Sequence, residues 1–299
     1  MKSEITYWCP KTSSLVAEEI YGEKWLRFSY ENFFGNIGLW ALVKRAWFSR
    51  WYGRKMDKPE SKKKIIPFIE KYGLDCSEFL QEPNSFTSFN QFFYRQLKPE
   101  SRPISPGEKV VVFPADGRHF LIPDLSQTQY IYAKGQCFEL KSLLGCHRLA
   151  NQFESGSALI SRLCPVDYHR FHFPVSGKSG IPKLINGDLF SVNPIALRKK
   201  ISIFWQNKRY IHILQNEHLG DMIQLLVGAT CVGSVHFTAK EDSWISKGEE
   251  CGYFSFGGSC VISIFPENKI RFNDQLLDNS SKGYETYFQM GEYLGGFAN

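Results

Sequence analysis

One short stretch near the carboxyl end of the sequence combines a flexible turn with a nucleophile. Gly257 and Gly258 precede Ser259, and an apolar, β-branched run follows over 260–265. Glycine reaches backbone angles that are closed to other residues, so the peptide between Gly258 and Ser259 can be held in a strained turn. The Ser259 hydroxyl could then attack the Gly258 carbonyl and shift the acyl group from nitrogen to oxygen. The ester would break by β-elimination, which cuts the chain and turns residue 259 into an N-terminal pyruvoyl group. The alternative is an ordinary turn before a strand.

Two histidines lie in a short segment bounded by prolines. His169 and His172 are three residues apart, between Pro165 and Pro174. On a strand such side chains point to opposite faces, and the prolines leave too short a segment for a helix, so both rings cannot meet one metal ion. No cysteine or carboxylate follows at a ligand spacing, and the sequence therefore predicts no metal site. Each histidine is either structural or a proton carrier, since the pKa of histidine lies near neutrality.

An aspartate occupies a turn earlier in the sequence. The motif Pro-Ala-Asp-Gly at 114–117 contains Asp116 and directly follows an apolar run. An aspartate in such a turn commonly accepts hydrogen bonds from its own backbone. A catalytic use is the alternative, because a hydroxyl, an imidazole and a carboxylate can act together whatever their order in the chain. Asp116, His172 and Ser259 could supply these three groups.

These stretches together resemble the phosphatidylserine decarboxylase family. The resemblance covers about residues 85 to 272, with the motifs in the family's order. The family's cleavage site reads Leu-Gly-Ser-Thr or Gly-Gly-Ser-Thr, so Cys260 replaces the usual threonine here. The matching segments are Phe-Tyr-Arg-x-Leu-Lys-Pro at 93–99, Pro-Ala-Asp-Gly at 114–117, Asp-Tyr-His-Arg-x-His-x-Pro at 167–174, Phe-Ser-Val-Asn-Pro at 190–194, Leu-Val-Gly-Ala-x-x-Val-Gly-Ser at 226–234 and Gly-Gly-Ser at 257–259.

The resemblance implies a self-cleaving decarboxylase. The chain would be cut between Gly258 and Ser259 into a β chain of residues 1–258 and an α chain of residues 259–299, which stay together as a heterodimer. The pyruvoyl group made from Ser259 would form a Schiff base with phosphatidylserine. It would then act as an electron sink while carbon dioxide leaves, and the product would be phosphatidylethanolamine.

The same resemblance assigns roles to the candidate residues. His172 takes the proton from the Ser259 hydroxyl, Asp116 orients His172, and His169 protonates the substrate carbon after decarboxylation. Three arginines are candidates to hold a phosphate or a carboxylate, with surface charge as the alternative: Arg162, Arg170 and Arg198.

Two other functions stay open at this point. A serine hydrolase could use Asp116, His172 and Ser259 on an external substrate and would leave the chain whole. A non-catalytic adaptor that binds a membrane or a nucleic acid would also leave the chain whole. The mass of the purified protein would therefore separate self-cleavage from both alternatives.

The elements that must position these residues fall into two parts. Residues 13–98 carry helical, aromatic-rich patterns, and a proline-rich connector follows at 102–107. Beyond it come short β-like runs separated by turn residues. We therefore predict an α+β fold, with a helical, membrane-associating N-terminal region over 1–105 and a mainly β catalytic domain over 106–299. The expected strands include 110–113, 129–133, 158–163, 222–235 and 260–265.

Tryptophans and basic residues gather in the expected helical region. Trp40, Val43, Trp47 and Trp51 follow helical spacing and form one apolar stripe, and residues 44–64 hold nine basic side chains against two acidic ones. Both features suit the headgroup zone of an anionic membrane. A helix packed on the protein, with a solvated basic edge, is the alternative. No nucleic-acid partner is expected, because no recognisable nucleic-acid-binding module accompanies the patch.

Composition narrows where the protein works. The sequence has no run of about 18 uninterrupted apolar residues, and its start lacks the pattern of a signal peptide. Its eight cysteines are scattered singly, which indicates reduced thiols. These features predict a peripheral protein on the cytoplasmic face of the cell membrane. Homo-oligomerisation and acyl-chain preference stay open.

Overall fold

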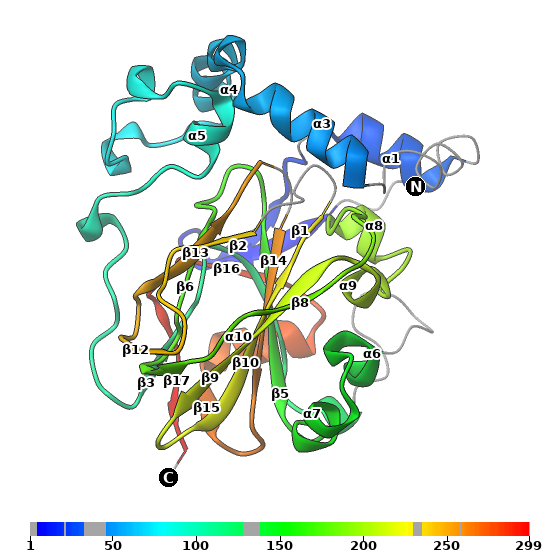
Figure 1. Cartoon of the computed structure of the whole chain (residues 1–299), viewed down its shortest axis with the longest axis vertical. Helices are drawn as coiled ribbons and strands as arrows, with labels where there is room; N and C mark the ends of the chain where they lie inside the picture. The colour runs from blue at the N-terminus through cyan, green and yellow to red at the C-terminus, as the bar shows by residue number, and fades with distance from the viewer. Residues whose placement is uncertain are drawn as a thin grey trace.

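Three β-sheets with a group of helices across one end make up the described part of the chain (Figure 1). The computed structural model describes residues 5–20, 22–32, 46–127, 138–229, 235–256 and 259–298. The mixture of helices with a large sheet confirms the α+β class. The expected strand at 129–133 lies outside the described residues.

The largest sheet runs in the order β12, β7, β9, β10, β14, β5, β4, β16, β1, β2, and β8 pairs with β9 beside this path. Neighbouring strands are antiparallel except for the parallel pair β1 and β16. The bounds are β1 Thr6–Cys9, β2 Ser14–Ala17, β4 Gly117–Ile122, β5 Ser157–Leu163, β7 Gly177–Ser179, β8 Lys183–Ile185, β9 Arg209–Asn216, β10 Gly220–Val227, β12 Ser243–Ile245, β14 Ser259–Phe265 and β16 Thr286–Phe288.

Two smaller sheets and the helices complete the fold. One small sheet has the order β11, β13, β6, and the other has the order β15, β17, β3. Their bounds are β3 Val110–Val112, β6 Arg170–His172, β11 Val235–Phe237, β13 Glu250–Phe254, β15 Ile270–Phe272 and β17 Tyr293–Phe297. The α-helices are α1 Glu23–Glu31, α3 Ala46–Asp57, α4 Ile65–Tyr72, α5 Phe89–Phe93, α6 Leu140–Leu144, α7 His147–Gln152, α8 Pro194–Leu197, α9 Ile203–Gln206 and α10 Asp274–Ser281. Within the described ranges no helix has the length and apolar character needed to cross a bilayer.

Strand β14 is buried on both of its faces. Cys260 and Ile262 belong to one hydrophobic core, while Val261 and Phe265 belong to a second core. Side chains alternate along a strand, so Ser259 faces the same side as Val261. That second core also contains residues of β6 and β13, and Ser259 therefore faces the layer that carries the histidine segment.

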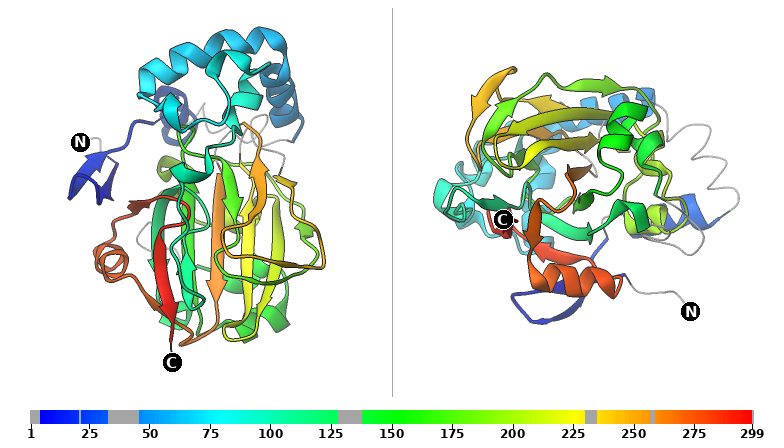
Figure 2. Two further views of the ribbon diagram at one scale, coloured as in Figure 1. Left: turned by 90° about the vertical axis from the view of Figure 1, so that its left-hand side faces the viewer. Right: turned by 90° about the horizontal axis from the view of Figure 1, so that it is seen from below.

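The helices α3, α4 and α5 form a separate layer above the strands (Figure 2). A third hydrophobic core lies in this layer, and nine of its ten fully buried members come from residues 56–93. The tenth is Phe256, which belongs to the connection that leads into β14. The helical layer therefore packs directly on the segment that precedes Ser259.

The N-terminal region differs from the expectation at its start. Strand β2 falls within residues 13–98, which were expected to be helical, and it forms a hairpin with β1. Trp8 of β1 pairs with Thr286 of β16, so this hairpin extends the large sheet. Pairing with a strand that is distant in sequence overrides local preference here. The strands expected near 110–113, 158–163 and 260–265 are confirmed as β3, β5 and β14.

Candidate active site

Ser259 begins the central strand β14 and is fully buried. It pairs with Leu163 of β5 in the antiparallel register. Its Oγ makes no hydrogen bond with any residue that the structure describes. A buried hydroxyl that lacks a hydrogen-bond partner lowers the stability of the folded chain, so this oxygen is available to interact with another group. Gly257 and Gly258, the other half of the expected cleavage site, lie outside the described residues.

His172 lies at the end of β6 with its two ring nitrogens in different surroundings. Nδ1 lies 3.0 Å from the Gly248 carbonyl oxygen, which makes Nδ1 the protonated nitrogen of a neutral ring. Nε2 is buried and has no hydrogen-bond partner within the described ranges. Burial lowers the pKa of His172, against smaller raising effects from the Gly248 carbonyl and Glu250. At neutral pH this histidine is therefore uncharged, with a lone pair on Nε2 that can accept a proton.

Asp116 is buried in the turn between β3 and β4, and its carboxylate faces Arg102. Arg102 donates from Nε at 3.0 Å and from Nη2 at 2.7 Å, and the Met290 backbone N–H donates at 2.8 Å. Burial raises the pKa of Asp116, while these donors oppose that shift. The adjacent Asp116 carboxylate in turn raises the pKa of Arg102 against the effect of burial. These donations hold the carboxylate in a fixed orientation.

The expected hydrogen bond from His172 to Asp116 is not formed among the described residues. The Gly248 carbonyl occupies the place beside Nδ1 that the aspartate was expected to fill. The turn itself still contacts the histidine, because the His172 backbone N–H donates to the Pro114 carbonyl at 2.7 Å. The turn that carries Asp116 therefore contacts the backbone of His172, while the Asp116 carboxylate makes no hydrogen bond with the His172 ring in the described structure.

His169 is fully buried just before β6 and lies against the helical layer. Its Nδ1 lies 3.0 Å from the Asp167 carbonyl oxygen. Its ring centroid is 3.9 Å from that of Phe93, and Phe93 in turn lies 4.9 Å from Phe256. His169 and the segment before Ser259 thus share one aromatic neighbour on α5. The described residues include no group of three or more His, Cys, Asp or Glu side chains that could hold a metal ion.

The three candidate arginines lie in different surroundings. Arg162 is buried rather than exposed, and its guanidinium donates to Glu18 at 2.5 Å and to Glu285 at 2.6 Å. Because Arg162 is buried in these ion pairs, the structure argues against both earlier interpretations, a ligand of an external phosphate and a surface charge. Arg170 is paired with Glu250 at 2.8 Å. Arg198 is exposed at the end of α8.

Sequence reasoning missed Arg102 and Gly248 as partners of the site. Arg102 was interpreted only as part of the proline-rich connector, although an arginine just before the catalytic domain is a possible partner for a buried acid. Gly248 contributes the backbone carbonyl that faces His172 Nδ1, and a pattern of side-chain types cannot predict a backbone contact of this kind. The contact between Arg102 and Asp116 spans 14 residues of the chain, and the contact between His172 and Gly248 spans 76.

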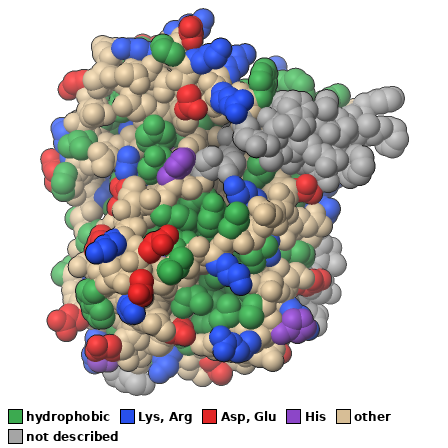
Figure 3. Space-filling view, in the orientation of Figure 1, with side chains coloured by type: hydrophobic (Ala, Val, Ile, Leu, Met, Phe, Trp, Pro, Cys, Tyr) green, Lys and Arg blue, Asp and Glu red, His purple; other side chains and the backbone are tan. Residues whose placement is uncertain are grey.

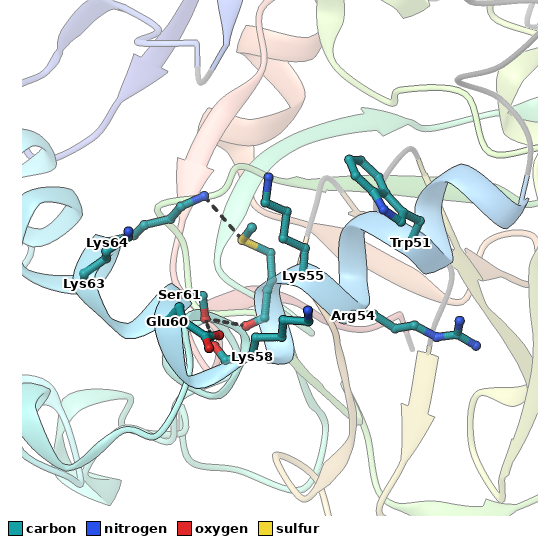
Figure 4. Close-up of a pocket in the computed structure, with 9 residues that line it drawn as sticks. Trp51, Arg54, Lys55, Lys58, Glu60, Ser61, Lys63 and Lys64 are labelled. Carbon is teal, nitrogen blue, oxygen red and sulfur yellow. Dashed lines mark hydrogen bonds between the residues drawn. The ribbon is translucent and has the colours of Figure 1, made fainter.

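A basic pocket lies between α3 and the following turn at Pro59–Lys64 in the helical layer (Figure 4). Its lining includes Trp51, Lys55, Lys58, Lys63 and Lys64. Trp51 is 53% exposed, and Lys55 Nζ lies 5.6 Å from the centre of its ring. In the space-filling view, basic side chains gather along the upper edge over this layer (Figure 3). Trp40 and Val43 of the expected stripe lie outside the described residues, as does the side chain of Trp47.

Comparison with known proteins bears on this arrangement. The family model described as phosphatidylserine decarboxylase matches residues 89–296, a range that includes every candidate catalytic residue. The chain belongs to the phosphatidylserine decarboxylase family. Relatives named phosphatidylserine decarboxylase proenzyme include one from Fusobacterium nucleatum, 42% identical over 296 residues, which covers 99% of each chain. One from Chlamydia muridarum is 40% identical over 292 residues, covering 98% of this chain and 97% of the relative.

The similarity to these phosphatidylserine decarboxylase relatives extends beyond the range of the family model. A Clostridium kluyveri relative of the same name is 40% identical over 291 residues, covering 97% of this chain and 98% of its own. Alignments of that length include the N-terminal helices that precede residue 89. The range over which the chain resembles these relatives thus includes the residues of the helical layer.

Proposed function

We propose that this chain is a phosphatidylserine decarboxylase that makes its own pyruvoyl group from Ser259. The observation that carries the proposal is that Ser259 Oγ and His172 Nε2 are each buried without a hydrogen-bond partner in the described structure, with Ser259 facing the layer that carries the histidine segment. One is a nucleophile that needs a base, and the other is a base that needs a proton. Membership of the family supports the same assignment.

In the proposed self-cleavage, His172 Nε2 removes the proton from Ser259 Oγ as the oxygen attacks the Gly258 carbonyl carbon. The C–N bond breaks, the amine of residue 259 takes the proton, and an ester joins the two residues. Loss of the Ser259 Cα proton then expels the Gly258 carboxylate and leaves dehydroalanine. Water replaces its nitrogen, ammonia leaves, and a pyruvoyl group results. The Gly248 carbonyl keeps His172 in the tautomer that this sequence needs.

A pyruvoyl group fits at position 259, because the position is buried and its side-chain oxygen gives up no protein hydrogen bond in the described structure. Such a group supplies a carbonyl that takes up the substrate amine and accepts electrons as carbon dioxide leaves. His169 is the proposed proton donor to the substrate carbon. The Asp167 carbonyl engages Nδ1 of this ring, which directs proton exchange with the substrate to Nε2.

Binding of the anionic membrane surface is assigned in this proposal to the basic pocket. Lysines beside an exposed tryptophan match a headgroup zone that carries negative charge. We assign the protein a peripheral position on the cytoplasmic face, where anionic lipids attract such segments. There it would convert phosphatidylserine to phosphatidylethanolamine, with the chains 1–258 and 259–299 held together as a heterodimer.

Mass spectrometry and a denaturing gel of the purified protein test self-cleavage. We expect two chains, the smaller beginning with a carbonyl that hydrazine traps, and one intact chain from Ser259→Ala. Ser263→Ala is the matched control, because Ser263 is equally buried on the same strand and its Oγ also lacks a hydrogen-bond partner in the described part. It should cleave normally. An intact wild-type chain with decarboxylase activity would refute the proposal.

The serine hydrolase alternative requires Ser259 to meet an external substrate in the uncut chain. Ser259 is 0% exposed, which disfavours that encounter. The internal carbonyl of residue 258 needs no such access, since it is covalently adjacent. Labelling of the intact chain by a serine-reactive probe would favour the hydrolase.

A further inference from the structure

The helical layer contacts the proposed cleavage segment, residues 256–259, through one buried side-chain amide. Asn90 lies in α5 and is 5% exposed. Its Oδ1 accepts a hydrogen bond of 2.8 Å from the Phe256 backbone N–H, and its Nδ2 donates to Asp57 Oδ1 at 2.6 Å. Asp57 is the last residue of α3. The amide therefore joins two helices to the backbone two residues before Gly258.

The side chain of Phe256 is held by the same layer. Its ring lies 5.2 Å from Phe89, 4.9 Å from Phe93 and 5.8 Å from Tyr52, measured between ring centres. Phe256 is 4% exposed. The main chain and the side chain at this position are thus both fixed by residues of the N-terminal region.

The other end of the cleavage segment is fixed by the sheet. Ser259 pairs with Leu163, and the next residue, Cys260, pairs with Val227 on the opposite side of β14. Each residue spans at most about 3.6 Å of extended chain, so the fixed positions of Phe256 and Ser259 limit the distance that the connection between them covers. The direction in which the Gly258 carbonyl meets Ser259 Oγ depends on where these two ends are fixed.

We propose that Asn90 is a positioning residue for self-cleavage, and that Asp57 sets the orientation of its amide. With Nδ2 engaged by the Asp57 carboxylate, Oδ1 faces the Phe256 N–H, and this fixes the backbone that leads into the scissile peptide. The N-terminal helices then act in maturation as well as in membrane contact. This inference rests on the self-cleavage proposed above.

Cell-free synthesis of the full chain tests this role. Samples are quenched in denaturant at intervals, and the intact chain and its two products are quantified on a gel. Asn90→Ala should slow cleavage by about 10- to 100-fold, the scale of a small misplacement of reacting atoms. Asn90→Asp should be at least as slow, because its carboxylate faces that of Asp57.

Exchanging the two side chains separates positioning from general stability. In the double variant Asp57→Asn/Asn90→Asp, one carboxylate oxygen of residue 90 accepts from the Phe256 N–H and the other accepts from the residue 57 amide. We expect the double variant to cleave at least 10-fold faster than Asn90→Asp alone, because the restored hydrogen bonds recover part of the rate that misplacement of the reacting atoms had cost. Asn279→Ala is the matched control, because Asn279 is also 5% exposed and its amide donates to Thr286. It should lower the melting temperature without slowing cleavage.

The outcomes distinguish this inference from the proposed function. If the wild-type chain stays whole, self-cleavage itself is refuted. If the wild-type chain is cut and Asn90→Ala is cut at the same rate, only the role of Asn90 is refuted. A double variant that is no faster than Asn90→Asp would also overturn it, even if Asn90→Ala folds poorly.

Discussion

His172 and His169 differ in the environment that each ring meets. His172 faces the Gly248 carbonyl at 3.0 Å and is drawn toward the neutral state by burial. His169 is held between the Asp167 carbonyl and the Phe93 ring. In both rings Nδ1 lies 3.0 Å from a backbone carbonyl, and the proposal assigns His172 to self-cleavage and His169 to proton transfer during decarboxylation. The two residues should therefore fail at different steps.

We expect His172→Ala to block the cut and His169→Ala to leave it intact. Loss of a general base typically costs a factor of about 10²–10⁴ in rate. His172→Ala should thus stay a single chain over hours, and His169→Ala should mature normally but release carbon dioxide slowly. A gel time course and an assay of released carbon dioxide measure the two steps. Maturation of His172→Ala at the wild-type rate would remove His172 from the first step.

Motifs were enough to select these residues but not to define their contacts. Asp116, His169, His172 and Ser259 could be selected because each lies in a short pattern of specific residue types. The partners of Asp116 could not be predicted, because Arg102 and Met290 are brought to it by the folded chain. Hydrogen-bond geometry between distant segments is a tertiary property, and a local pattern does not encode it.

At the scale of elements, α3 takes part in two features. Its Tyr52 ring stacks on Phe256, and its Asp57 accepts a hydrogen bond from Asn90. Its Trp51 and Lys55 line the basic pocket. One helix thus contributes to the proposed membrane surface and contacts the segment that precedes Ser259.

Charge reversal in the pocket should weaken binding to anionic vesicles. A lysine near such a surface contributes about 1 kcal/mol, so Lys58→Glu/Lys63→Glu should lower the affinity by about 10-fold or more. Sedimentation with phosphatidylserine-containing liposomes at two salt concentrations measures this. Lys109→Glu/Lys269→Glu is the control, with the same charge change on exposed residues beside the C-terminal strand β17. Equal loss in both variants would show that net charge, not the pocket, governs binding.

Strands buried on both faces were the easiest elements to predict. The runs that became β5 and β14 are apolar and bounded by turn residues, which is a strong local signal. The hairpin of β1 and β2 was missed, because its four-residue strands gain their stability from pairing with β16. Beyond β15 the chain supplies α10, β16 and β17.

For the whole molecule, a buried histidine outside the proposed site couples stability to pH. His119 connects three strands of the large sheet, with Nδ1 2.9 Å from Ser161 Oγ and Nε2 3.2 Å from the Phe288 carbonyl. Burial lowers the pKa of His119 to about 3. The unfolded chain takes up a proton near the ordinary histidine value of about 6.5, while the folded chain does not. Stability from this group is therefore present above pH ~6.5 and is lost as the pH falls toward ~3.

We expect the free energy of unfolding to decrease by up to about 1.4 kcal/mol per pH unit from this residue below pH ~6.5. In His119→Gln that contribution should disappear, and the curve of unfolding free energy against pH should be flatter by that amount. Urea unfolding between about pH 4 and 7 measures both curves. The Ser259→Ala background keeps the chain in one piece during the measurement. Parallel curves for the two proteins would contradict the assignment.

The position of β14 in the middle of the large sheet determines whether the two chains could reassemble after the cut. This strand pairs with β10 on one side and β5 on the other, and the segment after it adds β16 and Glu285 to the same sheet. A cut before Ser259 would leave a short peptide threaded through a body that has already formed around it. Two separated pieces would have to meet again by diffusion to rebuild such a sheet. Maturation would then be a one-way event, and the native arrangement would persist by kinetic trapping.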